Sequence, residues 1–401
     1  METGLLRRVV FGLSLSIMFI FGASDMLRGV VAPFLQRGLH LNYLQLGYLF
    51  SGNSLGYLLG SLLAGFAIER MGLRKVNVLG VLVNVCGILW IANGSSFLSL
   101  LLGFLVMGLG GGWLEIAVNG VVPAMASSNH GQARLFNWLH GFYGIGAFTF
   151  PVVAAWWIAR THGNWHSIYL VLAVILGASL LLVVFANYRG LHPTANRGDD
   201  STSAKQFFRN PVLYGLVVAI VAYVMAEVGM ATWLPTYLIH VHGFSLTQGS
   251  LYLSGFYFTF TVGRLTAHLW VPRAGSERAV LLSSIAAVVL LVFGWSGQGW
   301  LLGAFIVAGF GFAVIFPTIT AVASHTFPNH AGKVLGLLFS ASAMGSLTAN
   351  SLIGLISIGF GIRTGFLLIA VFMLLVTGSI LFVTWQQRRV EQGATPYTEV
   401  L

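Results

Sequence analysis

The sequence predicts an all-α membrane protein with twelve transmembrane helices in two pseudo-symmetric halves of six. Three observations lead to this fold class. Apolar stretches of about 20 residues, long enough to cross a bilayer, recur along the whole chain. Charged residues make up 7% of the 401 residues, against about 25% in soluble domains. Several residue patterns of the first half also return in the second half at a nearly constant offset.

Polar breaks divide the chain into twelve candidate spans. In order, the predicted spans are residues 9–32, 44–68, 76–93, 98–125, 134–158, 167–187, 210–239, 246–271, 279–296, 300–325, 333–358 and 363–385. Because twelve is an even number, we expect both termini on the same side of the membrane.

The basic residues predict which side that is. Fifteen Lys and Arg residues would lie on the side of the termini, and only Arg37, Arg160 and Arg363 on the opposite side. Basic loops are retained in the cytoplasm. We therefore expect a multi-pass protein of the cytoplasmic (plasma) membrane with both termini in the cytoplasm.

The longest polar segment predicts the boundary between the halves. We expect an N-terminal six-helix half in residues 1–187, a flexible cytoplasmic linker in 188–209, and a C-terminal six-helix half with a short cytoplasmic tail in 210–401. The linker is rich in Ser, Asp, Gly and Arg, a composition typical of loops.

The two halves resemble each other in sequence. Asp25 precedes Pro33 by eight residues, as Glu227 precedes Pro235. Six further residues recur at an offset of 203: Ser51, Gly52, Gly60, Arg70, Gly72 and Lys75 correspond to Ser254, Gly255, Gly263, Arg273, Gly275 and Arg278. Parallel repeats of six spans are a transporter architecture, with the substrate site between the halves.

Charged residues interrupt some of the apolar spans. Asp25 and Arg28 lie one turn apart in the first span, and ionisable groups at bilayer depth normally face a bundle interior or a water-filled path. The alternative is a structural pair in which the two charges neutralise each other. The same choice arises for Glu227, the counterpart of Asp25, and Arg264 in the eighth span, which either face the substrate path or pair with each other.

A motif between the second and third spans identifies the family that the chain resembles. Residues 65–75 read GFAIERMGLRK. In this pattern Gly65 is followed, after three residues, by the acid Glu69 and a base. A second glycine comes two residues after that base, and two bases close the motif after one further residue. This resembles the signature loop of the major facilitator superfamily and implies the major facilitator fold with alternating access. Spaced glycines permit a tight turn and close helix approach, and the charges can form a cytoplasmic lock. The alternative is that the basic residues only set topology. The gating candidates are Gly65, Glu69, Arg70, Gly72, Arg74 and Lys75.

Polar residues in the fourth and fifth spans narrow the resemblance. Glu115 and Asn119 share one helix face, and Asn137, His140 and Tyr143 follow at i, i+3 and i+6. Removal from water favours the protonated form of a carboxyl group, so Glu115 can bind and release a proton during a cycle. These elements resemble the fucose, galactose and glucose:proton symporters. In that family a fourth-span glutamate and a first-span aspartate serve coupling or substrate binding, and fifth-span amides contact sugar.

Two departures place the chain in a broader branch of that family. His140 and Tyr143 stand where fucose permeases carry glutamine and asparagine, and their first-span aspartate aligns with Gly29, one turn from Asp25. The resemblance therefore implies a sugar-like substrate, and it does not point specifically to L-fucose.

The resemblance and the intramembrane polar residues together yield a set of site candidates. We expect Glu115 to carry the proton, with Asp25 and Glu227 as secondary acids. The candidates for substrate binding have polar or aromatic side chains inside a span: Asn119, Asn137, His140, Tyr143, Arg28, Trp113, Trp138, Tyr223, Trp233, Tyr237 and Arg264. Aromatic side chains can stack on a sugar ring, and the alternative for each is ordinary helix packing.

Other chemistry is missing from the sequence. It contains no phosphate-binding loop, no His/Cys spacing typical of a metal site and no nucleophile with a base at a known spacing. The single cysteine, Cys86, has no partner for an internal disulfide. We therefore expect neither an enzyme nor a metal or cofactor site, with the proton gradient as energy source.

The predicted function is secondary active transport of a sugar or a similar small polar solute by alternating access, with proton symport. The alternatives are a proton-driven exporter of metabolites or drugs, a transporter of an organic anion such as a sugar acid, and a relative that senses instead of transporting. The net charge of +10 lies in short loops, so it predicts orientation and no nucleic-acid partner. We expect a monomer whose partners are the solute, protons and the lipid bilayer.

Overall fold

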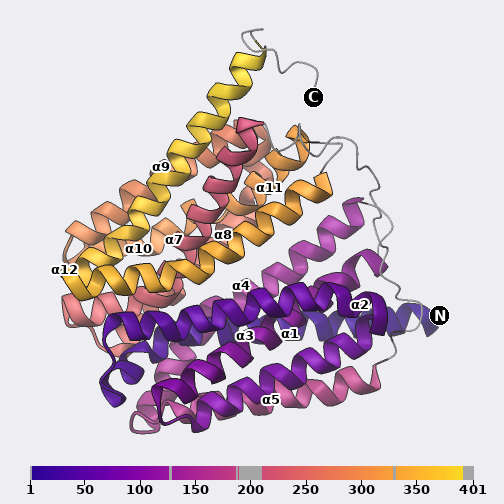
Figure 1. Cartoon of the computed structure of the whole chain (residues 1–401), viewed down its shortest axis with the longest axis vertical. Coiled ribbons are helices and arrows are strands. Elements are labelled where there is room, and N and C mark those ends of the chain that lie inside the picture. Colours follow the sequence, from indigo (N-terminus) through magenta and orange to yellow (C-terminus); the bar gives the residue numbers. More distant parts are fainter. Residues whose placement is uncertain (1, 126–128, 187, 189–209, 328–330, 392–401) are drawn as a thin grey trace.

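Helices form nearly all of the chain that this computed structural model describes, which comprises residues 2–125, 129–186, 188, 210–327 and 331–391. The first group of helices contains α1 (Glu2–Gly38), α2 (Tyr43–Asn93), α3 (Phe97–Met125), α4 (Asn129–Arg160) and α5 (His166–Phe185). The second group contains α7 (Pro211–His242), α8 (Leu246–Ala274), α9 (Ser276–Ser296), the 3₁₀ helix η1 (Gly299–Gly303), α10 (Ala304–Phe312), α11 (Ile315–Thr326) and α12 (Ala331–Glu391). Figure 1 shows the two groups as separate layers.

The helices α2 and α12 are each too long for one membrane crossing. They have 51 and 61 residues, which at about 1.5 Å per residue is roughly 75 and 90 Å, against a hydrocarbon core of about 30 Å. Each is interrupted by one glycine, Gly72 (φ 77°, ψ 163°) in α2 and Gly361 (φ 81°, ψ 158°) in α12. Positive φ disfavours residues with a side chain, so glycine permits a tight turn there. Each element is therefore two helices joined by a turn.

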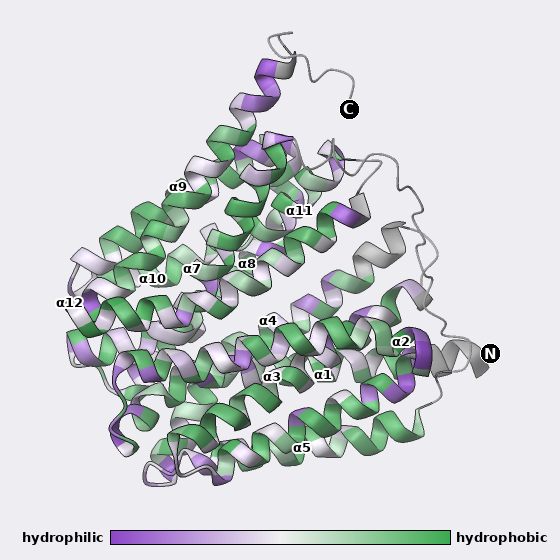
Figure 2. Cartoon of the chain, viewed as in Figure 1, coloured by the Kyte–Doolittle hydropathy of each residue, from purple (hydrophilic) through white to green (hydrophobic). Residues whose placement is uncertain are grey.

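Nine helices in the described part of the chain are long and apolar enough to cross a membrane. Figure 2 shows apolar residues along most of their length and hydrophilic residues gathered at their ends. If α2 and α12 are each counted as two helices, the nine candidate segments become eleven. The helix α8 is not among these nine, but with 29 residues it is also long enough to cross a membrane. The predicted all-helical apolar architecture is observed, and the number of twelve crossings stays a prediction.

The predicted tenth span, residues 300–325, is divided into η1, α10 and α11. Pro317 has no N–H, and its ring disfavours a regular helix around the carbonyl four residues earlier. That carbonyl belongs to Ala313, in the break between α10 and α11. It instead accepts a hydrogen bond of 3.2 Å from Nε of Arg264 in α8. The break in the helix thus positions a charged side chain.

The two groups of helices meet on one side of the molecule. We call this the far side, where α1 ends and α2 begins, and call the opposite side, where α1 and α7 begin, the terminal side. Near the start of α2, Ser51 Oγ donates to Leu347 O and contacts Ser351 Oγ, each at 2.7 Å, and the hydroxyls of Ser54 and Ser346 are 2.9 Å apart. In Figure 1 the groups lie close together there, at the left, and diverge toward the N-terminus.

Local features recur between the groups at the offset found in the sequence. A capping box opens α2 at Asn42 and opens α8 at Ser245, 203 positions later. Gly72 and Gly275 both have positive φ, 77° and 84°, at the ends of the corresponding helices. These correspondences agree with the predicted internal duplication. The proposed linker itself, apart from Tyr188, lies outside the described residues.

Candidate functional site

Asp25 and Arg28 form an ion pair on α1. Arg28 Nη1 also donates to Asn53 Oδ1 of α2 at 2.8 Å, and Asn53 Nδ2 donates in turn to Phe104 O of α3 at 3.1 Å. The Arg28 side chain is only 5% exposed, whereas that of Asp25 is 25% exposed. On its open side Asp25 Oδ2 accepts a hydrogen bond of 2.9 Å from the hydroxyl of Tyr143 on α4. The pairing weighed from the sequence is observed, and it ties α1, α2 and α4 together.

Glu115 on α3 has one hydrogen-bond partner among the described residues. The hydroxyl of Tyr57 on α2 donates to Glu115 Oε2 at 2.6 Å. Nearby on the same helix, Asn119 Oδ1 and Trp113 Nε1 are buried without a protein partner in the described part of the chain. Buried polar atoms are normally hydrogen-bonded, so unpaired ones here indicate a place for water or a polar solute.

Arg264 on α8 is held by two contacts. Its Nε donates to the carbonyl of Ala313 that Pro317 leaves free, and its guanidinium lies 4.4 Å from the centroid of the Phe260 ring. No described carboxylate lies within 4.0 Å of this guanidinium. The ion pair between Glu227 and Arg264 that the sequence suggested is therefore not formed in this structure.

Charges from both groups of helices nevertheless converge on one region. Glu227 on α7 interacts electrostatically with Arg264 and with Asp25. The ring of Tyr257 on α8, which is fully buried, interacts with Glu227, Asp25, Arg28 and Arg264. The ionisable residues of α1, α7 and α8 thus face one site between the two groups, as expected for a transporter with its site at the repeat interface.

The α4 candidates extend from this site toward the terminal side. His140 interacts electrostatically with Arg264, which places it beside the second group of helices. One turn closer to the terminal side, Asn137 is exposed and Trp138 is 52% exposed, with the Trp138 ring 6.4 Å from that of Phe142. These side chains are accessible, and the nearby Arg134 side chain lies outside the described residues.

Three aromatic candidates on α7 are fully buried. Trp233 donates from Nε1 to Asn350 Oδ1 at 3.1 Å, and Tyr237 stacks on Phe366 with ring centroids 4.3 Å apart. Both lie in the packed core near the far side, where helix packing covers their surfaces, and their contact with substrate stays a prediction. Tyr223 is also buried, and its hydroxyl lies beside Glu227, with which it interacts.

The predicted gating loop is the turn inside α2. Gly72 has the positive φ that the tight turn requires. A Cβ on Gly65 would meet nothing within 4 Å, so the expected close helix approach at Gly65 is wrong for this structure. Glu69 is exposed and has no ion pair within 4.0 Å among the described residues, whereas Arg74 donates to Val184 O at the end of α5. Arg70 and Lys75 are exposed.

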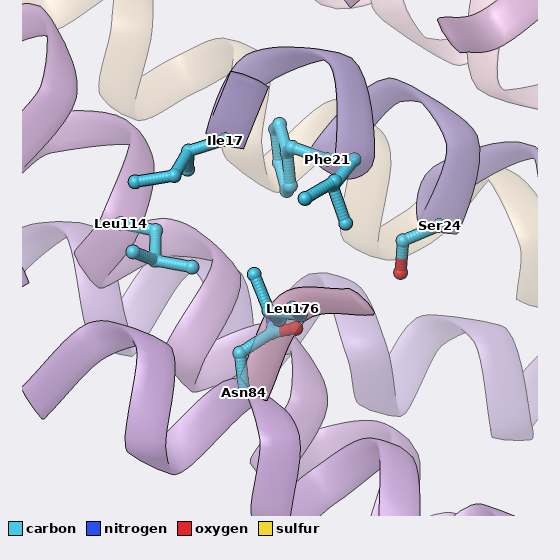
Figure 3. A pocket seen from close by; sticks show the side chains of 7 residues that line it. Ile17, Phe21, Ser24, Asn84, Leu114 and Leu176 are labelled. Atoms are coloured by element: carbon cyan, nitrogen blue, oxygen red, sulfur yellow. The ribbon is translucent and has the colours of Figure 1, made fainter. Parts of the chain in front are cut away.

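A small cavity lies inside the first group of helices, beside α1. Its volume is about 10 Å³, and Figure 3 shows apolar side chains around it together with Ser24 and Asn84. Ligand pockets usually have about 300–1,000 Å³. Asn84 also donates to Met107 O at 2.8 Å. The cavity is too small and too apolar to be the solute site.

The sequence analysis missed Tyr57, Asn53 and Tyr257 as site residues. Each is a polar side chain inside an apolar span, which is the signal that could have found them. Tyr57 and Asn53 bind charged residues on other helices, Glu115 and Arg28, and residue spacing along one helix does not show such pairs.

Comparison with known proteins settles the family. The model of the Major Facilitator Superfamily matches residues 13–291 and 243–399. The chain belongs to the Major Facilitator Superfamily. The resemblance predicted from residues 65–75 is confirmed. The family and the fold are those of a multi-pass membrane transporter and not of an enzyme.

Similar proteins of this superfamily include protein TsgA of Escherichia coli O157:H7 (strain EC4115 / EHEC), 24% identical over 208 residues that cover 51% of this chain and 52% of TsgA. The match thus spans about half the length of that relative. The TsgA homologue of Serratia proteamaculans (strain 568) is 22% identical over 290 residues, 71% of this chain and 72% of its own.

Solved structures share the fold over nearly the whole chain. A mutant of the nucleoside transporter NupG has a TM-score of 0.78 at 13% identity, covering 94% of this chain and 99% of its own. A mutant of the Escherichia coli fucose:proton symporter FucP has a TM-score of 0.64 at 19% identity, with 93% and 98% covered. At these identities the likeness concerns the fold alone.

Proposed function

We propose that this chain is a secondary active transporter that moves a sugar or a similar small polar solute across the cytoplasmic membrane by alternating access, in symport with protons. The observation that carries the proposal is the pair of carboxyl groups on α1 and α3, each hydrogen-bonded to a tyrosine hydroxyl: Asp25 to Tyr143 and Glu115 to Tyr57. Carboxyl groups at membrane depth are typical of proton relays in transporters.

Glu115 is the proton carrier in this proposal. It has one hydrogen-bond partner and no cation beside it among the described residues, so its carboxyl group is free to exchange a proton. Asp25 is held by Arg28, and this supports a secondary role. Glu227 is the third acid.

The solute-binding residues in this proposal surround those acids. Polar atoms on Trp113 and Asn119 that have no partner among the described residues support a polar solute over an apolar one, because an apolar ligand would leave them unsatisfied. Two of the solved structures with this fold are those of a nucleoside transporter and a fucose:proton symporter. The proposed binding residues are Asn119, Asn137, His140, Tyr143, Trp113, Trp138, Tyr223 and Arg264, while Arg28, which pairs with Asp25, holds that acid in place.

The turn of α2 is the proposed gate. Its charge lock would form when the groups approach each other on the terminal side, and the free Glu69 of this structure is consistent with a released lock. The proposed gating residues are Glu69, Arg70, Gly72, Arg74 and Lys75. The distribution of basic residues supports the placement of the terminal side in the cytoplasm. We also propose that the protein is a monomer and that residues 188–209 link its two halves.

The test is transport into proteoliposomes that contain the purified full chain and a pH-sensitive dye. Fucose, galactose, glucose, glucuronate and uridine are offered with and without an imposed proton gradient. We expect at least one solute to enter together with protons. The variant Glu115→Gln should lose proton movement, because an amide cannot exchange the proton.

The matched control is Glu277→Gln. Glu277 lies in the first turn of α9, outside the site, so this variant should transport like the wild type. Solute entry that is indifferent to the proton gradient would make the protein a facilitator. Failure to import any of these solutes would overturn the proposal in favour of an exporter or a sensor.

A further inference from the structure

We propose that Arg264 binds a carboxylate and that the transported solute is an organic anion with one carboxylate on a polyhydroxylated body, such as a sugar acid. This inference rests on the proposed transport function and names the class of solute. It starts from a guanidinium that lies at membrane depth without a described carboxylate within 4.0 Å.

The surroundings of Arg264 leave its binding edge free. The hydrogen bond from Nε to Ala313 O fixes one edge, and the ring of Phe260 covers one face. The two terminal nitrogens, Nη1 and Nη2, make no hydrogen bond to a described residue. A guanidinium fixed in this way presents parallel N–H donors that match the two oxygens of a carboxylate.

The other intramembrane arginine shows what a structural arginine looks like in this protein. Arg28 is 5% exposed, forms an ion pair with Asp25 and donates to Asn53. Its charge and its donors are therefore satisfied within the chain. Arg264 is only partly buried and has no ion pair or terminal-nitrogen hydrogen bond to a described residue, so its terminal donors are open to a ligand.

The charge balance of the site points to an anion. The charges of Asp25 and Arg28 cancel, and Glu115 and Glu227 are neutral when protonated. Arg264 then leaves the site with one positive charge. An unpaired cation at membrane depth is costly. A carboxylate removes this cost, whereas a neutral sugar does not.

Glu227 provides the link to protons. It interacts electrostatically with Arg264, so an ionised Glu227 would attract the guanidinium and repel the carboxylate of a solute. Binding of the solute carboxylate then requires Glu227 to take up a proton from water, so one proton accompanies each anion. The other ionisable groups that face this pair are Asp25 and Arg28 on α1, His140 and Tyr143 on α4, Tyr223 on α7 and Tyr257 on α8.

Calorimetric titration of the purified full chain tests the carboxylate subsite. The probes are D-glucuronate and D-gluconate against D-glucose and D-galactose, which lack the carboxylate. The wild type should bind the acids more tightly than the neutral sugars. Arg264→Gln should weaken binding of the acids by roughly 30-fold or more, because a buried charge partner is lost. It should weaken the binding of neutral sugars far less, because they have no carboxylate for the guanidinium to bind.

The matched control is Arg363→Gln. Arg363 also lies over an aromatic ring, 5.0 Å from that of Trp295, but near the Gly361 turn of α12 on the far side. It should bind the acids as the wild type does. If Arg264→Gln does not fold, Arg264→Lys keeps the charge without the planar donor pair, and it should still lose affinity for the acids.

Proton uptake tests the role of Glu227. Titration in two buffers of different ionisation enthalpy should show one proton taken up per glucuronate in the wild type and none in Glu227→Gln. Acids that bind Arg264→Gln as tightly as the wild type would overturn the inference. If neutral sugars bind best and move with protons, the carboxylate subsite is overturned while the proposed transport function stands. If no probe binds, the carboxylate subsite and the proposed transport function are both overturned.

Discussion

At the scale of single residues, tyrosine hydroxyls are the partners of the membrane-depth acids. Tyr143 on α4 donates a hydrogen bond to Asp25 on α1, and Tyr57 on α2 donates one to Glu115 on α3. A hydroxyl satisfies a carboxyl group in either protonation state, because it can donate to the ionised form and accept from the neutral one. Such a partner suits an acid that must exchange its proton during a transport cycle.

The first prediction concerns the hydrogen bond of Glu115. Tyr57→Phe removes the donor and keeps the ring. A hydrogen bond to a charged group contributes about 1.5–3 kcal/mol, so we expect proton-coupled uptake to slow about tenfold or more. Proton flux in proteoliposomes measures this. Tyr48→Phe is the control, since Tyr48 lies on the same helix but is 47% exposed; equal loss in both variants would contradict the prediction.

The second prediction concerns the ion pair on α1. Arg28→Met leaves Asp25 without its partner, and removal of one member of a buried pair costs about 3–5 kcal/mol. We expect a large drop in thermal stability in detergent. The double variant Asp25→Asn/Arg28→Met should recover most of the stability, because no unpaired charge remains. A double variant as unstable as the single one would show that packing, and not charge, accounts for the loss.

At the scale of helices, glycines set the contact between α2 and α3. A Cβ on Gly56 would overlap the carbonyl oxygen of Leu105, and one on Gly60 would overlap that of Leu109. The two backbones therefore touch, as small residues permit in membrane helices. Gly65, one and a half turns further along α2, meets nothing. The same residue type thus has different roles on one helix.

The third prediction uses this contrast. Gly56→Ala inserts a methyl group into the contact and should destabilise the protein by about 1–3 kcal/mol. Gly65→Ala has open space and improves helix propensity by up to about 1 kcal/mol, so it should leave stability unchanged or slightly raised. Thermal unfolding of both variants in the same detergent compares them. Equal melting temperatures would contradict the α2–α3 packing described above.

At the scale of the whole molecule, the two groups of helices touch on the far side and diverge on the terminal side (Figure 1). Serine hydroxyls and close glycine contacts form the far-side contact: a Cβ on Gly354 of α12 would overlap Tyr43 O, and one on Gly29 of α1 would overlap Ala231 O. These serine and glycine contacts are uncharged. They can therefore be exchanged for contacts on the terminal side at modest cost, which alternating access requires.

The fourth prediction is that this contact must open during transport. In a Cys86→Ala background, Ser54→Cys/Ser346→Cys should cross-link on oxidation, since the native hydroxyls are 2.9 Å apart. Uptake should stop and return after reduction. The control Ser284→Cys/Thr377→Cys has the same native separation, 2.9 Å, but joins α9 to α12 within one group. Its cross-link should leave uptake intact, and transport by the cross-linked Ser54 pair would contradict alternating access here.

Much of the fold could be predicted because its signals are local. Span length follows from runs of apolar residues, the α2 turn from Gly72 and its flanking charges, and the duplication from an offset of 203. The broken tenth span was missed, although Pro317 is visible in the sequence. A proline in a membrane helix breaks it only where another group, here Arg264, satisfies the freed carbonyl, and that partner lies on another helix.

The sequence by itself determined the class of the protein, its superfamily and the acids and arginines at membrane depth, because hydrophobicity and motif spacing are properties of consecutive residues. The tertiary structure decided how those residues pair. Arg28 pairs with Asp25, and Tyr57 donates a hydrogen bond to Glu115. Trp233 and Tyr237 are buried in helix packing. The terminal nitrogens of Arg264 have no partner among the described residues. These outcomes depend on which helices become neighbours, and close backbone contacts between residues far apart in the sequence set that arrangement.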